Sequence, residues 1–183
     1  MLDFTVIAIL FFLAAQLFTV AIGIDFKQLG GKAILFVFGL AIGQVFLFWI
    51  GYGLGSLFMH LMEGFKSFVI FAALFLIAIR MLMESFPVWK GERTYSFDSF
   101  RMIQFAGLAQ GINTFLMGLL FVFLPFEKYW LMTILFIFTL IFSLAGLLVK
   151  PTKNSITFAA LMFVLGGILM TFSSIYIGFF AIE

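Results

Sequence analysis

Six long apolar stretches, separated by polar links, dominate this chain. They are Phe4–Ile24, Ala33–Met59, Ser67–Met83, Met102–Leu124, Tyr129–Val149 and Ile156–Ala181. A helix needs about 20 apolar residues to cross the hydrocarbon core of a bilayer, so each stretch predicts one spanning helix. Lipid offers the backbone no hydrogen-bond partners, which excludes open strands from these segments. The predicted fold class is therefore all-α: a polytopic membrane protein with six transmembrane helices.

Composition argues against a soluble domain. The chain is 65% hydrophobic and 10% charged, whereas soluble domains carry about 25% charged residues. The net charge of +2 is too small to predict a nucleic-acid partner, and the absence of cysteine excludes thiolate metal ligands. The partner that composition predicts is the lipid bilayer.

Basic residues are distributed unevenly between the links. The first, third and fifth links hold Lys27, Lys32, Lys90, Arg93, Arg101, Lys150 and Lys153, whereas the second and fourth hold only Lys66 and Lys128. Lys and Arg accumulate in the cytoplasmic links of membrane proteins. We therefore expect the odd-numbered links in the cytoplasm and both the N and C termini outside.

The two halves of the chain resemble each other. Residues 71–83 read FAALFLIAIRMLM and residues 158–170 read FAALMFVLGGILM, with six of thirteen positions identical. Gln44 in the second stretch aligns with Thr139 in the fifth, and Gln16 in the first corresponds to the region of Asn113 in the fourth. Three spans per copy is an odd number, so the second copy is upside down. The expected organisation is two inverted three-helix repeats, residues 1–84 and 102–183, joined by a polar cytoplasmic linker of residues 85–101.

Several polar residues fall inside the apolar stretches. They are Gln16, Gln44, Gln110, Asn113, Thr139 and Ser143. A polar side chain in hydrocarbon costs free energy unless it finds a partner, so these groups should face one another or a cavity. One interpretation is a central polar site whose oxygens coordinate a cation or a polar solute. The other is hydrogen bonding between helices, worth roughly 0.6 kcal/mol per bond on average.

Two further patterns have both a structural and a functional interpretation. Gly39 and Gly43, like Gly51 and Gly55, have the GxxxG spacing that allows close helix packing or marks a flexible helix beside a pathway. Arg80 and Glu84 are four residues apart near the end of the third stretch. They form either an interfacial ion pair or a gate.

Catalytic chemistry is not indicated. The sequence contains no zinc-ligand spacing, P-loop or nucleophile elbow. We therefore expect no enzymatic activity, no catalytic residues and no cofactor.

Two segments resemble the MntP family, small six-helix manganese efflux pumps in the wider LysE-like group of exporters. Residues 50–55 (IGYGLG) are similar to its I-G-W-G-x-G segment, and residues 80–86 (RMLMESF) to its R-M-I-x-E-x-F segment. The spacing between the segments also agrees. The resemblance implies an exporter of Mn²⁺ in the bacterial cytoplasmic membrane.

Three positions depart from the family pattern in the same direction. Where the family has an Asp in span one, a Glu in span two and an Asp in span four, this chain has Gln16, Gln44 and Asn113. A neutral amide site offers oxygens to a hard ion such as Mn²⁺ but no negative charge to compensate it. Two functions therefore remain open. One is a transporter of manganese or a less charged solute; the other is a non-transporting subunit that pairs with another membrane protein or with copies of itself.

Overall fold

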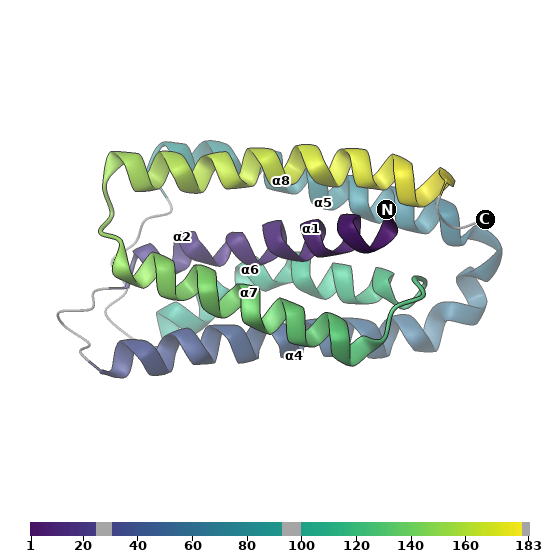
Figure 1. Cartoon of the computed structure of the whole chain (residues 1–183), viewed down its shortest axis with the longest axis horizontal. Coiled ribbons are helices and arrows are strands. Elements are labelled where there is room, and N and C mark those ends of the chain that lie inside the picture. Colours follow the sequence, from purple (N-terminus) through teal and green to yellow (C-terminus); the bar gives the residue numbers. More distant parts are fainter. Residues whose placement is uncertain (25–30, 93–99, 181–183) are drawn as a thin grey trace.

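Helices account for every regular element in the described part of the chain. A computed structural model describes residues 1–24, 31–92 and 100–180 (Figure 1). Its elements are α1 (Leu2–Ala15), α2 (Leu17–Ile22), α4 (Lys32–Met62), the 3₁₀ turn η1 (Glu63–Phe65), α5 (Lys66–Trp89), α6 (Phe100–Phe121), α7 (Lys128–Leu148) and α8 (Lys153–Phe180). With α1 and α2 counted together, six helical segments are long and apolar enough to cross a membrane. The predicted fold class is confirmed.

The outer surface of the bundle is apolar. Large hydrophobic side chains are exposed on it, among them Leu35, Leu57, Phe68, Leu76, Phe105 and Phe172. On a soluble monomer, apolar patches of this extent would be an aggregation hazard. Against acyl chains they are matched to their surroundings, so the exposed faces are those that meet lipid.

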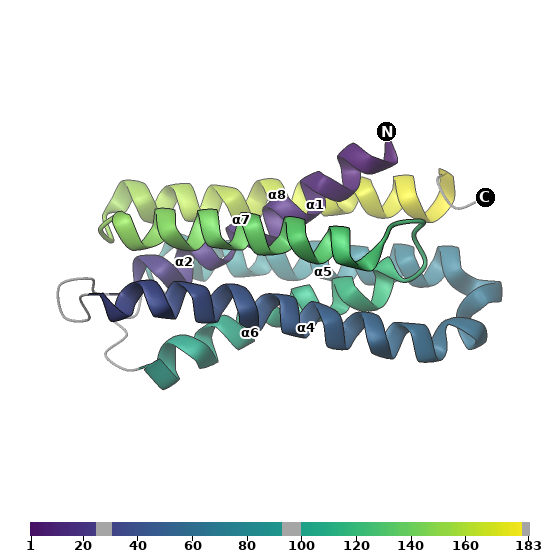
Figure 2. The same ribbon diagram turned by 60° about the horizontal axis from the view of Figure 1, so that its bottom comes forward.

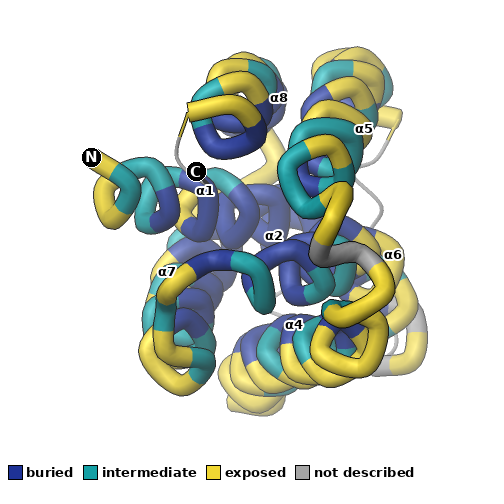
Figure 3. Tube along the Cα trace, turned by 90° about the vertical axis from the view of Figure 1, so that its right-hand side faces the viewer, coloured by how far each residue is buried: buried dark blue, intermediate teal, exposed yellow. Residues whose placement is uncertain are grey.

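The first span is the central helix of the bundle. In its most apolar window 72% of residues are buried, whereas no other span exceeds 50%. Seen along the bundle, α1 and α2 lie among the other helices (Figure 3). They pack mainly against α7 and α8. Gln16 and Thr19, which belong to this span, are therefore placed inside the protein, away from lipid.

Two helix pairs account for most of the remaining contact. α5 packs along α8, and α4 packs along α6. The start of α1 and the end of α8 lie at the same end of the bundle, together with the α4–α5 turn and the α6–α7 link (Figures 1 and 2). The α7–α8 link lies at the opposite end. An even number of spans returns the chain to the side on which it started, so six spans place both termini at the same end of the bundle.

Glycine creates the closest approach between α4 and α6. A Cβ on Gly51 would lie under 3.0 Å from the backbone oxygen of Phe115, and one on Gly55 would lie 2.6 Å from that of Leu119. At Gly43 a Cβ would meet no atom within 4 Å. The packing interpretation is therefore confirmed for Gly51 and Gly55 and is wrong for Gly43.

The third span is longer than its apolar stretch predicts. α5 continues past Met83 to Trp89, and α6 already begins at Phe100, so the non-helical link is shorter than the expected linker of residues 85–101. The extra turns keep a buried face that includes Glu84 and Val88. Polar residues in these extra turns lower the hydropathy of the segment after Met83. The segment stays helical because one of its faces is buried against neighbouring helices.

A Schellman motif ends α5. Gly91 has a positive φ of 74°, a conformation that glycine adopts without steric cost. Its N–H donates to the Val88 carbonyl at 3.0 Å, and the Glu92 N–H donates to the Pro87 carbonyl at 3.0 Å. These bonds satisfy carbonyls that the helix end leaves free. Gly91 was thus a stop signal available in the sequence.

Candidate functional site

A hydrogen bond between two amide side chains lies at the centre of the candidate site. Asn113 Nδ2 on α6 donates to Gln16 Oε1 at 2.8 Å, and both residues are buried. Gln16 stands at the junction of α1 and α2, where its backbone keeps helical dihedral angles. Both the N–H and the hydroxyl of Thr19 donate to the Gln16 carbonyl, at 3.3 and 2.6 Å. The helix is therefore interrupted at Gln16 by a single tighter turn, in which residue 19 bonds to residue 16 as in a 3₁₀ helix.

Gln44, on α4, is bonded to α6, the helix that carries Asn113. Its Nε2 donates to the Gly107 carbonyl at 2.8 Å, and the Thr114 hydroxyl donates to its Oε1. No hydrogen bond among the described residues joins Gln44 to Gln16 or Asn113. Thr114 was missed by sequence analysis, although Gly107, Gly111 and Thr114 share one helical face by their spacing.

The remaining predicted site residues are buried without a visible partner. Gln110 lies on α6, and Thr139 and Ser143 lie on α7; all three are at most 5% exposed. Gln110 Oε1, Thr139 Oγ1 and Ser143 Oγ make no hydrogen bond. The described contacts therefore connect Gln16 with Asn113 and leave these three outside that pair. Their part in a common site stays a prediction.

One free acceptor and one free donor group also remain within the amide pair. Asn113 Oδ1 and Gln16 Nε2 are buried and unpaired after their mutual bond is made. A buried polar atom without a partner costs about 1–3 kcal/mol. Asn113 Oδ1 is accordingly a position at which a cation, a polar solute or a water molecule gains from binding, whereas Gln16 Nε2 can only donate a hydrogen bond.

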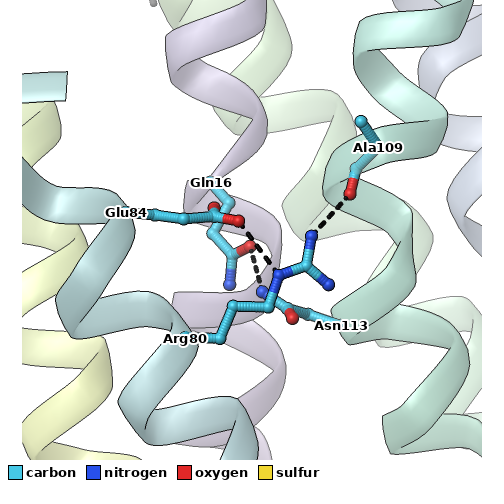
Figure 4. A network of polar contacts seen from close by, with 5 residues as sticks. All are labelled: Gln16, Arg80, Glu84, Ala109 and Asn113. Carbon is cyan, nitrogen blue, oxygen red and sulfur yellow. Dashed lines mark hydrogen bonds and ion pairs between the residues drawn. The ribbon is translucent and has the colours of Figure 1, made fainter. Parts of the chain in front are cut away.

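The Arg80–Glu84 ion pair adjoins the amide pair. Arg80 Nε lies 3.0 Å from Glu84 Oε1, and Arg80 Nη2 donates to the Ala109 carbonyl on α6 at 3.0 Å. Both side chains reach from α5 towards Gln16 and Asn113 (Figure 4). Because α5 continues to Trp89, Arg80 lies about two and a half turns and Glu84 about one and a half turns before the helix end. The helix thus extends past the apolar stretch whose end the pair was expected to mark, and both interpretations of the pair, as an interfacial ion pair and as a gate, stay predictions.

These groups define the chemistry that the site can support. It offers amide, hydroxyl and backbone oxygens together with one buried carboxylate, Glu84, whose Oε2 makes no hydrogen bond. No cluster of three or more His, Cys, Asp or Glu side chains occurs in the described part of the chain. Oxygen donors suit hard cations such as Mn²⁺, Mg²⁺ and Ca²⁺, but the donor set has little negative charge.

Comparison with known proteins agrees with this architecture. A family model named Mntp and described as "Putative manganese efflux pump" matches residues 32–177. The match includes the segments with Gln44, Arg80 and Asn113 but not the span with Gln16. No curated protein and no solved structure matches the chain significantly. Because the family model covers most of the chain, including five of the six spans, this protein belongs to the MntP family of manganese efflux pumps.

Proposed function

We propose that this chain is a membrane efflux transporter for Mn²⁺ and that the ion passes the buried amides Gln16, Gln44 and Asn113. The observation that carries the proposal is the Gln16–Asn113 bond in the middle of a six-span bundle of this family. The unpaired Asn113 Oδ1 supplies an oxygen there. Amide oxygens can replace part of the hydration shell of a hard ion.

Two corresponding contacts support an inverted repeat around this site. Just as a Cβ on Gly51 would meet the backbone oxygen of Phe115, one on Gly146 would lie 2.7 Å from that of Phe18. Gly51 and Gly146 are separated by the same sequence offset as Gln44 and Thr139. The contacts join span two to span four and span five to span one, as an exchange of the two halves requires.

The Gln16–Asn113 pair also fits an exchange of the two halves of the chain. The sequence offset between Gln16 and Asn113 equals that between Phe18 and Phe115. Equivalent residues that touch each other lie on the axis relating the repeats. Inverted-repeat transporters bind substrate near this axis at the membrane midplane, which supports a substrate site beside Gln16 and Asn113. The proposed repeats are residues 1–84 and 102–183.

Charge sets the expected strength of transport. The family's three carboxylate positions hold Gln16, Gln44 and Asn113 here, so the ion loses hydration without gaining their negative charge. We expect wild type to give weak Mn²⁺ resistance to an export-deficient host. The triple variant Gln16→Asp, Gln44→Glu, Asn113→Asp should give stronger resistance.

Growth on graded Mn²⁺ and cellular Mn²⁺ content measure the effect. Expression in the membrane must be matched, because buried carboxylates also cost stability. The variant Asn113→Leu, which removes the free oxygen, is the control that should abolish resistance. Strong wild-type resistance that Asn113→Leu leaves intact would exclude the amide site from the pathway.

A second function is favoured by the electrostatics of the site. Arg80 neutralises Glu84, the only buried Asp or Glu among the described residues, so the ion pair offers a dication no net negative charge. A chain of this kind could act as a non-transporting subunit that binds another membrane protein or a copy of itself. Absence of resistance from both wild type and the triple variant, with both well folded, would favour this role. Co-purification would then identify the partner.

A further inference from the structure

One ion pair stands out from the other charges of the chain. Glu84 is the only buried Asp or Glu among the described residues. Arg80 is the only Lys or Arg in the interior of a described helix, since the others lie at helix ends or in links. A charge inside a span is costly, so two adjacent ones that persist there need an explanation beyond packing.

The carboxylate of Glu84 is only half satisfied. Oε1 accepts a hydrogen bond from Arg80 Nε, whereas the buried Oε2 accepts none from any described residue. Figure 4 shows this carboxylate in the same region as the Gln16–Asn113 pair, and the bond from Arg80 to the Ala109 carbonyl ties the ion pair to α6 one turn before Asn113. Asn113 Oδ1 is a second buried oxygen without a partner. An anionic oxygen and a neutral oxygen thus remain available around the amide pair.

Arg80 is the less buried member of the pair. Its side chain is 30% exposed, against 9% for Glu84. Its second bond is to the Ala109 carbonyl, one helical turn before Asn113 on α6. A flexible, partly exposed guanidinium can leave the carboxylate at smaller cost than the carboxylate can leave its site.

We propose that Glu84 is the anionic ligand of the central cation site and that Arg80 is its tethered counter-ion, which an entering cation displaces. This inference rests on the proposed cation transport through the site. With Arg80 in place the site is neutral; with Arg80 displaced, Glu84 Oε1 and Oε2 face the cation together with Asn113 Oδ1. Return of the guanidinium to Glu84 then promotes release of the cation.

Displacement has a measurable consequence for affinity. If the cation binds only when Arg80 is displaced, its apparent Kd is the intrinsic Kd divided by the fraction of protein in which Arg80 is displaced. Arg80→Gln removes the competitor and a repelling charge, so it should tighten Mn²⁺ binding about five- to tenfold. Glu84→Gln should abolish saturable binding, and it should do so in the Arg80→Gln background as well.

Binding of Mn²⁺ to purified protein in detergent tests this, with free Mn²⁺ measured by electron paramagnetic resonance. Arg101→Gln is the matched control, because it removes a positive charge from an exposed position near the start of α6; it should leave affinity unchanged. Arg80→Met, which keeps an aliphatic stem, serves if Arg80→Gln does not give monodisperse protein. Affinity no tighter than wild type in the folded Arg80 variants, or binding that survives Glu84→Gln, would overturn the proposal.

The binding assay separates this inference from the proposed function. Tightening by Arg80→Gln that requires Glu84, in a protein that confers no Mn²⁺ resistance, would reject export and support the counter-ion role. Resistance that depends on Asn113, with Mn²⁺ binding indifferent to Glu84, would support export and reject the counter-ion role.

Discussion

Two glycines on α4, Gly53 and Gly55, provide a sharp test of the helix packing that supports the site. The test compares two single variants, Gly53→Ala and Gly55→Ala. At Gly55 the new Cβ would lie 2.6 Å from the backbone oxygen of Leu119 and 3.1 Å from its Cα. At Gly53 it would meet nothing within 4 Å. The two variants make the same chemical change on one helix, and only one of them meets α6.

The expected difference follows from these distances. Real Cβ atoms essentially never approach closer than 3.0 Å, so Gly55→Ala forces α4 and α6 apart by at least about 0.4 Å at a backbone contact that no rotamer change relieves. Overpacking of this kind costs about 1–3 kcal/mol. Alanine offsets up to about 1 kcal/mol of this through its helix propensity. The same propensity leaves Gly53→Ala neutral or slightly stabilised.

Thermal unfolding in detergent, followed by tryptophan fluorescence, measures the effect. Helix propensity cancels between the two variants, so their difference is the overpacking cost of about 1–3 kcal/mol. At about 2–4 °C per kcal/mol for a chain of this size, Gly55→Ala should unfold roughly 2–12 °C below Gly53→Ala. Separation of α4 from α6 should also weaken Mn²⁺ resistance, because Gln44 is held to α6 by Gly107 and Thr114. Equal unfolding temperatures for the two variants would show that the close contact between α4 and α6 is misplaced.

Two other predictions concern the amide pair and the orientation of the chain. Gln16→Leu and Asn113→Leu should each lower the unfolding free energy by about 1–2 kcal/mol, because each leaves a buried amide unpaired. The double variant should recover part of this loss in thermal unfolding; strictly additive effects would argue against the bond. Because the chain has no cysteine, a thiol reagent that cannot cross membranes reports orientation without background. Applied outside intact cells, it should label Glu127→Cys in the fourth link and spare Asn154→Cys at the start of α8; the reverse pattern would invert the topology.

The repeat and the polar residues could be related before the structure was known. Comparison of the halves related Gln16 to the region of Asn113, and the structure joins these two residues by a hydrogen bond. The partner of Gln44 was not foreseen, since its bonds to Gly107 and Thr114 depend on how α6 is rotated against α4. The extension of α5 to Trp89 was also missed, because hydropathy falls after Met83 while one face stays buried.

The sequence by itself determined the number of spans and the all-helical fold. Continuous apolar stretches of sufficient length have one stable form in lipid, a helix whose backbone bonds are internal. Tertiary structure alone decided which face of each helix is inside, because apolar residues suit both acyl chains and neighbouring helices. The periodicity that identifies the buried face of a soluble helix is therefore weak here. For this reason only the packed structure could bring Arg80 and Glu84 beside Gln16 and Asn113.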